Sequence, residues 1–247
     1  MQRAFAALIA AAALVALGGC KPNSPSPAAA PREESPTGSG EESDRPTLLL
    51  LTTLPLMFGE SFGLEGNGSP ALEALETRYA VRPLAVADAK SLSQGKLLLM
   101  AHPLAQPADA LVDLDAWVRD GGSLLLLADP ALDWHSKLPL GDSRRAPPAF
   151  ADTGLLSHWG LRLDAPDERG PMQRRVGGHE ILTVSPGTLT GRCAITRDRA
   201  VARCRIGQGQ VTVVADADFL NVEDLDGPIE QNLGAMLAEL AALEQRP

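Results

Sequence analysis

Asp120-Gly-Gly-Ser-Leu-Leu-Leu-Leu-Ala-Asp129-Pro130 is the stretch that decides the fold class of this chain. Four leucines follow a pair of glycines without alternation, and an acid and a proline end the run. Such a run is typical of a strand buried on both faces, as in a parallel sheet covered by helices. The preceding residues 107–119 carry apolar side chains at helical spacing, which supplies the crossover helix that a parallel pair needs. Asp129 is therefore expected just past the C-terminal end of a strand, where open α/β sheets bind their ligands.

The alternation of strand and helix continues along the chain. Strands are expected at 47–53, 81–86, 96–100, 124–129, 161–163, 179–184 and 210–216, and helices at 70–79, 107–119, 153–159 and 228–243. Residues 87–94 are interpreted as a link, and residues 164–178 as a polar segment without a regular element. This order predicts an α/β fold with a doubly wound, mostly parallel sheet. A β-hairpin is added at 191–206. Pro83 places its strand near an edge of the sheet.

Residues 1–20 have the layout of a secretory signal. Arg3 gives the positive start and residues 4–17 the apolar middle, which is too short for an ordinary membrane span. Leu17-Gly18-Gly19-Cys20 resembles the lipobox of bacterial lipoproteins. The resemblance implies lipid attachment, palmitate included, at Cys20, and a position in the cell envelope facing the periplasm. Lys21 favours the outer over the inner membrane. The alternative is an ordinary cleaved signal with a chance cysteine.

Residues 21–46 predict a disordered tether. They are rich in Pro, Ser, Ala, Gly and Glu and contain no Val, Ile, Leu or aromatic residue. A flexible chain of this length spans roughly 25–30 Å. Residues 47–247 then fit one domain of ordinary size.

The charge balance argues against nucleic acid as a partner. The formal net charge is −9, and loss of the expected signal with its one arginine brings it to about −10. An acidic chain has no net attraction to nucleic acid or to anionic lipid.

Cys193 and Cys204 predict a disulfide. An exported domain meets an oxidising compartment, where paired cysteines persist. A hairpin that turns at 197–200 places the two cysteines opposite each other at a non-hydrogen-bonded site, where Cα atoms approach to about 4.5 Å. Two buried free thiols are the alternative.

Acidic residues follow two of the expected strands. Asp129 ends one, and Asp216 and Asp218 follow the other, so the three converge if the strands are neighbours. Three carboxylates could bind a hard cation or perform acid–base chemistry. We favour the interpretation that they cap helix N-termini and turn the chain, and we assign neither metal nor cofactor. The candidate ligand or partner edge comprises Glu60, His102, Asp129, Asp216, Asp218 and Asn221.

The sequence contains no convincing nucleophile. Gly59-Glu60-Ser61-Phe62-Gly63 has the spacing of a nucleophile elbow, but Gly66, Gly68 and Pro70 prevent a helix directly after it. His135 lies next to Trp134, which more often indicates packing than catalysis. These features favour a non-catalytic protein.

Three stretches in order resemble a known family. They are Leu49-Leu-Leu-Thr-Thr53, Asp115-Ala-Trp-Val-Arg-Asp-Gly-Gly-Ser-Leu-Leu-Leu-Leu-Ala-Asp-Pro130 and Val214-Ala-Asp-Ala-Asp-Phe-Leu-Asn221. Together they resemble the uncharacterised ABC-type transport system family, which includes the auxiliary component of gliding-motility ABC transporters. The resemblance spans residues 46–243 and implies a flavodoxin-like fold similar to class I glutamine amidotransferases. It implies no catalytic residues. Family members are usually held by transmembrane helices, whereas a lipid anchor is expected here.

The resemblance implies a domain that accompanies an ABC transporter permease and ATPase. The expected function is therefore that of a periplasmic, lipid-anchored accessory or ligand-sensing domain, joined to the membrane through Cys20. Two alternatives remain: a metal-assisted hydrolase that uses the strand-end aspartates, and a structural lipoprotein of the cell envelope.

Overall fold

The computed structural model describes residues 45–57 and 68–245. The expected signal with Cys20, most of the expected tether, and Glu60 and Ser61 of the candidate sites lie outside the described residues. The tether was expected to reach residue 46. Arg45, however, donates a hydrogen bond to the carbonyl of Glu76, and the carbonyl of Pro46 accepts one from Ala80. These two residues already contact the domain.

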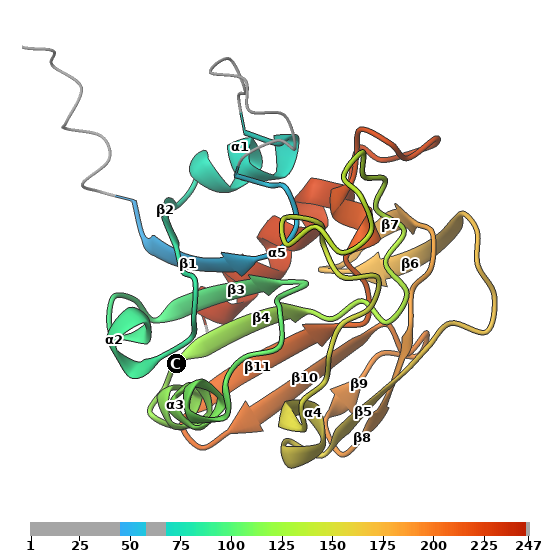
Figure 1. Cartoon of the computed structure of the whole chain (residues 1–247). Coiled ribbons are helices and arrows are strands. Elements are labelled where there is room, and N and C mark those ends of the chain that lie inside the picture. The colour runs from blue at the N-terminus through green and yellow to red at the C-terminus, as the bar shows by residue number, and fades with distance from the viewer. Residues whose placement is uncertain (1–44, 58–67, 246–247) are drawn as a thin grey trace, which may run out of the picture. The chain divides into compact units, whose positions relative to one another are not determined.

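A central sheet of seven strands runs through the described part of the chain (Figure 1). Its order is β2 (Ala80–Pro83), β1 (Thr47–Thr52), β3 (Leu97–Ala101), β4 (Ser123–Leu127), β11 (Gly209–Val214), β10 (Val201–Ile206) and β9 (Ala194–Ile195). The first five strands are parallel, and β10 and β9 continue the sheet in antiparallel pairing. The predicted mostly parallel sheet is confirmed, and so is the edge position of the strand that contains Pro83.

Helices cover both faces of this sheet. On one face lie α1 (Pro70–Glu76) and α5 (Asn232–Glu244), whose apolar side chains share a core with Leu48 and Leu50 of β1. On the other lie α2 (Ala89–Leu92), α3 (Ala108–Arg119) and α4 (Leu155–His158), whose apolar side chains belong to the core that contains Leu49 and Leu51. Each strand therefore buries successive side chains in opposite cores, which explains its unbroken run of leucines.

The helices differ in part from the sequence prediction: α1 ends at Glu76 rather than at residue 79, and α4 covers Leu155–His158 of the expected 153–159. Residues 87–94 were expected to be a plain link, but they contain α2, whose N-terminus is capped by Asp88 accepting a 2.7 Å hydrogen bond from the amide of Ser91. One turn of helix is too short to show apolar periodicity. The last helix was expected from residue 228, whereas α5 begins at Asn232. Within the described residues, no helix has the length and apolarity needed to cross a membrane.

Two small antiparallel sheets lie outside the central one. The first pairs β5 (Leu161–Asp164) with β8 (Thr188–Gly191), and the second pairs β6 (Met172–Val176) with β7 (His179–Thr183). The sequence prediction missed both β6 and β8. A signal for β6 was present in Gly177-Gly178, because both glycines have a positive φ, of 58° and 83°. Two such residues between strands are the requirement of a type I′ hairpin turn.

The predicted hairpin disulfide is present. In the pairing of β9 with β10, Ala194 faces Arg203 and Ile195 faces Ala202, so the same register places Cys193 opposite Cys204. The two cysteines are bonded, with Cα atoms 4.9 Å apart. The bond therefore closes the hairpin at the outer edge of the sheet.

Candidate functional site

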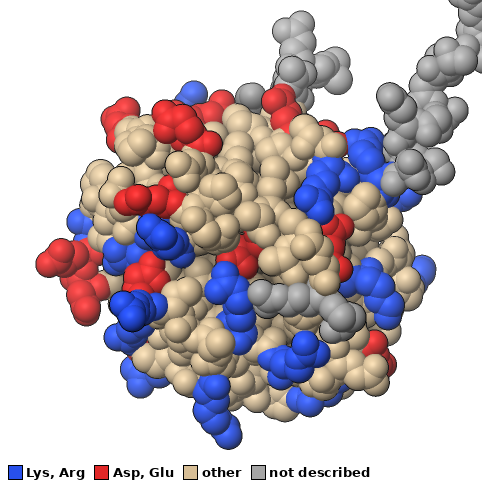
Figure 2. Space-filling view, turned by 180° about the vertical axis from the view of Figure 1, so that it is seen from behind, with Lys and Arg blue, Asp and Glu red and all other residues tan. Residues whose placement is uncertain are grey.

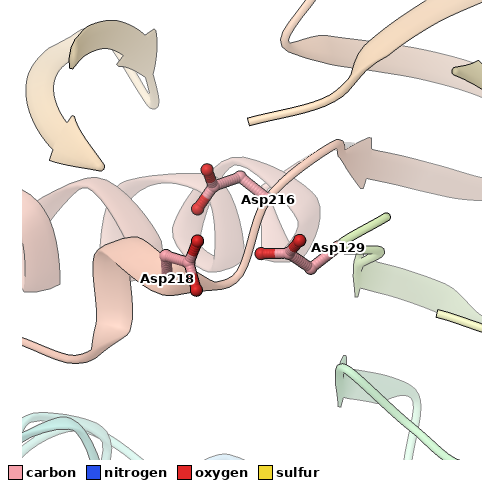
Figure 3. A group of neighbouring side chains, drawn as sticks. All are labelled: Asp129, Asp216 and Asp218. Atoms are coloured by element: carbon pink, nitrogen blue, oxygen red, sulfur yellow. The ribbon is translucent and has the colours of Figure 1, made fainter. Parts of the chain in front are cut away.

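Three aspartates meet at the C-terminal edge of the parallel sheet (Figure 3). Leu127 of β4 is paired with Val214 of β11, so the segments that follow these two strands leave the sheet side by side. Asp129 and Asp216 lie in these segments, and Asp218 begins the 3₁₀ helix η1 (Asp218–Leu220). One carboxylate oxygen from each residue lies within 4.8 Å of the other two, and all three side chains are buried.

Asp129 acts as a clamp on the backbone. Its Oδ1 accepts a 2.8 Å hydrogen bond from the amide of Ala131, and its Oδ2 accepts a 2.9 Å bond from the amide of Ala217. This is the turn-forming role that we favoured from the sequence. Burial raises the pKa of Asp129 to about 6, and the amide donors oppose that rise.

Asp216 is held by residues from two directions. Its Oδ2 accepts a 2.5 Å hydrogen bond from the hydroxyl of Thr183 in β7, and its Oδ1 accepts a 3.2 Å bond from the amide of Phe219. Burial raises its pKa well above the ordinary value, and the charges of Asp129 and Asp218 raise it further.

Asp218 is the least satisfied member of the cluster. Its Oδ1 accepts a 2.8 Å hydrogen bond from the amide of Asp133, whereas its Oδ2 is buried without a partner. The hydroxyl of Ser185 is also buried without a partner, although the Ser185 amide is close enough to lower the pKa of Asp218. Burial, followed by the charge of Asp129, nevertheless raises that pKa to about 7.

A polar pocket of about 300 Å³ adjoins the cluster on the side of Asp218. It is lined by Asp133, His135, Val184, Asp218, Asn221, Asp224 and Leu225. Asn221, which the sequence placed at this edge, donates a 3.0 Å hydrogen bond to Oδ2 of Asp224. The pocket therefore offers carboxylate and amide oxygens to a ligand that carries positive charge or hydrogen-bond donors.

The sequence analysis missed five of these lining residues, of which Asp133, His135 and Asp224 are titratable. Asp133 and Asp224 lie in irregular segments without any motif, so nothing in the pattern indicated them. His135 was interpreted as a packing residue because of its tryptophan neighbour, but it lines the pocket. Its position two residues after Asp133, in the loop that follows β4, was the available signal.

His102 lies apart from the residues that line the pocket. It follows β3 with a φ of 46°, and its side chain is fully buried. Its Nε2 lies 2.8 Å from the carbonyl of Pro147, which can only accept, so Nε2 carries the proton. Its Nδ1 has no partner, and burial lowers its pKa. His102 therefore fastens the long loop after β4.

The described residues contain no activated nucleophile. Cys193 and Cys204 are joined in a disulfide. The ring of His102 hydrogen-bonds to the carbonyl of Pro147 and that of His158 to Arg119, and within the described segments no histidine ring bonds to a serine or cysteine. The remaining chemistry of this edge is that of its carboxylates.

Comparison with known proteins supports the fold class. No family model matches the sequence, and no curated protein matches it. The N-terminal domain of IFT52 superposes with a TM-score of 0.52 at 16% identity, over 81% of this chain and 98% of that domain. Exo-β-1,4-mannosidase Op5Man5 from Opitutaceae bacterium strain TAV5 gives 0.48 at 16% identity, over 81% of this chain and 36% of the enzyme. The β-galactosidase Gan42B from G. stearothermophilus gives 0.46 at 14% identity, over 82% and 31%.

At 16% identity the superposition on the IFT52 domain bears on the fold alone, and the two glycosidase superpositions, with TM-scores under 0.5, carry no argument. The chain spans about a third of the length of the two glycosidases. The chain is therefore an α/β protein with a mostly parallel central sheet, and it carries an acidic cluster at the C-terminal ends of two neighbouring strands.

Proposed function

We propose that this chain is a lipid-anchored accessory or ligand-sensing domain of an ABC-type transport system, facing the periplasm and without catalytic activity. The sequence support is the lipobox-like end of the signal at Cys20 and the three stretches that resemble the transport-system family. We also propose the finer fold that this resemblance implies, flavodoxin-like and similar to class I glutamine amidotransferases. The parallel strands run in the order β2-β1-β3-β4-β11, which supports a flavodoxin-like arrangement.

One observation carries the non-catalytic part of the proposal. The strand-end carboxylates accept hydrogen bonds from backbone amides and a hydroxyl, and Asp218 among them lines a polar pocket. Asp129 fixes the two loops, and Asp218 and Asn221 are presented to the pocket. This suits a domain that recognises a ligand and transmits its presence through ordered loops.

The face of the domain drawn in Figure 2 also favours a protein partner over nucleic acid. Figure 2 shows the face turned away in Figure 1, where acidic and basic side chains are interspersed without a broad basic area. Such a mixed surface suits contact with another protein and offers no extended track for phosphates.

Affinity purification from crosslinked membranes tests the transporter association. The full chain should recover an ATPase and a permease, and Cys20→Ala should reduce their yield because the domain is no longer held at the membrane. Asp133→Asn/Asp224→Asn changes the pocket, and Asp109→Asn/Asp113→Asn on α3 is the matched control. If the pocket variant fails to recover the ATPase and permease while the α3 control recovers them, the partners contact the C-terminal edge of the sheet. Recovery of neither component with the full chain would contradict the proposal.

A metal-assisted hydrolase is the second candidate, because three carboxylates have converging oxygens and one of them, Asp218, lines the pocket. Its test is turnover of ester and phosphoester substrates with Mg²⁺ or Mn²⁺. Activity that Asp218→Asn abolishes and Asp224→Asn retains would favour the enzyme.

A further inference from the structure

We propose that Asp129, Asp216 and Asp218 bind one hard divalent cation, with Asp218 at the boundary between that cation and the adjoining pocket. The proposal adds a ligand to this edge and does not require the association with a transporter.

The geometry of the three carboxylates suits a shared cation. Cation–oxygen distances of roughly 2.0–2.6 Å separate two ligands of the same ion by roughly 3–5 Å. One oxygen from each aspartate lies within 4.8 Å of the others, which is inside that range. In Figure 3 the side chains come from three positions on two segments and turn their carboxylates toward one another.

The charge of the cluster lacks a protein counter-ion. No ion pair between described residues involves any of the three aspartates. Arg169 lowers the pKa of Asp129, but only through its charge at longer range. Because an unpaired buried carboxylate is costly, the cluster must hold either protons or a cation.

An unpartnered buried atom indicates where the cation contacts the protein most directly. The side chains supply six carboxylate oxygens, five of which each accept a hydrogen bond from an amide or hydroxyl. The sixth, Oδ2 of Asp218, is buried without a partner in a residue that is only 1% exposed. A carboxylate oxygen that accepts one hydrogen bond keeps a second lone pair for a metal, so all three aspartates remain competent ligands.

The surroundings select the type of cation. All of the clustered ligand atoms are carboxylate oxygens, which suit Mg²⁺, Mn²⁺ and Ca²⁺, whereas zinc sites commonly include cysteine or histidine. Asp218 also lines the pocket of about 300 Å³, which gives the ion a route of entry and room for water ligands. The buried hydroxyl of Ser185, which has no partner, is a further oxygen close to Asp218.

Calorimetric titration of the chelator-treated full chain with Mn²⁺, Mg²⁺ or Ca²⁺ tests this inference. One cation should bind per chain, and Asp218→Asn should weaken binding at least about tenfold, by analogy with the loss of a metal-site group. Asp218→Asn keeps the oxygen that accepts from Asp133 and therefore preserves the local fold. Asp109→Asn, which removes an exposed carboxylate from α3 outside both the cluster and the pocket, should leave cation binding unchanged.

Thermal unfolding separates a lost site from a lost fold. Mn²⁺ should raise the melting temperature of the wild type and of Asp109→Asn but not that of Asp218→Asn. Without cation, Asp218→Asn should melt at or above the wild-type temperature, because it loses a charge from a repulsive cluster. No binding to the wild type, or binding that Asp218→Asn leaves unchanged, would overturn the inference. Cation binding without recovery of an ATPase or permease would leave it standing and contradict only the proposed function.

Discussion

The amide of Ala217 donates a 2.9 Å hydrogen bond to Oδ2 of Asp129, which ties the segment after β11 to the segment after β4. The other oxygen of the same carboxylate holds the amide of Ala131. One buried side chain therefore fixes both loops that form the acidic edge. The clamp and the proposed cation site share this residue, so substitutions of Asp129 test the clamp, whereas substitutions of Asp218 test the cation.

The first prediction is that Asp129→Ala destabilises the fold by about 2–4 kcal/mol, because it leaves two buried amides without acceptors. Asp129→Asn keeps one acceptor and should lose less. Urea denaturation at pH 5 in the presence of a chelator measures the difference with little repulsion in the cluster. Equal stability of the alanine variant and the wild type would show that the clamp is not needed.

The second prediction is that cation-free protein loses stability as the pH rises from about 4 to 7. The pKa is raised to about 6 for Asp129 and about 7 for Asp218, whereas an unfolded aspartate titrates near 3.9. In this window the folded state binds more protons than the unfolded state, so the stability present below pH 4 is lost as the pH passes through the folded pKa values. For Asp129 alone, the rise in pKa from about 3.9 to about 6 corresponds to about 3 kcal/mol.

His102 contributes with the opposite sign. Its lowered pKa gives stability above about pH 6.5 that is lost as the pH falls. The measurement is therefore the difference between wild type and Asp218→Asn, from denaturation curves at several pH values. In the chelated protein, Asp218→Asn should become more stable relative to the wild type as the pH rises from about 4 to 7. Saturating Mn²⁺ should reduce this relative gain, because the cation stabilises the wild type. A difference independent of pH would contradict the assigned protonation.

The main sheet was predictable because its strands carry a signal that does not depend on distant residues. The leucine runs of β1, β3 and β4 are short, continuous and ended by polar residues, as strands buried on both faces require. The cysteine pairing followed from the register of one local hairpin. Asp129, Asp216 and Asp218 could be placed together because parallel neighbours end at one edge.

Strand β6, the pocket and the direction of the His102 side chain could not be predicted, because they depend on tertiary contacts that no local sequence pattern encodes. In β6, Gln173, Arg174 and Arg175 interrupt the apolar pattern, and the strand is formed by pairing with β7. The pocket joins Asp133 and Asp224 from loops 91 residues apart in sequence, a proximity that only the folded chain creates. His102 follows a strand as the other edge residues do, but its ring turns to Pro147, and rotamer choice cannot be read from spacing.

The third prediction concerns the backbone at His102. Its φ of 46° lies in the left-handed region, which asparagine tolerates and β-branched residues avoid. His102→Val should therefore destabilise the fold by about 1–3 kcal/mol more than His102→Asn. Chemical denaturation at pH 7.5, where the wild-type histidine is neutral, provides the comparison. If valine were tolerated as well as asparagine, the backbone strain would be absent.

The fourth prediction is that the disulfide contributes roughly 2–3 kcal/mol, because it closes a short loop in the unfolded chain. Cys193→Ala/Cys204→Ala should unfold at correspondingly lower urea concentration, and reductant should shift the wild type in the same direction but leave the double variant unchanged. Non-reducing mass spectrometry of protein isolated from the periplasm checks the bond itself. Two alkylatable thiols at these positions would contradict it.

The last prediction uses two glycines in opposite surroundings. A Cβ on Gly209, the first residue of β11, would lie 1.9 Å from the carbonyl oxygen of Val118 and 2.4 Å from that of Gly122. Both are backbone atoms where α3 passes into β4, so they cannot turn aside as a side chain would. Gly209→Ala should therefore force the helix away from the sheet and cost at least about 2 kcal/mol.

Gly234 lies in α5, and the nearest atom to its added Cβ is 3.9 Å away, in the ring of His179. Gly234→Ala should instead stabilise the helix by about 0.5–1 kcal/mol, because alanine loses less backbone freedom. Thermal and urea unfolding of the two variants beside the wild type measure the opposite signs, and a Gly209→Ala protein as stable as the wild type would show that α3 does not approach β11 so closely.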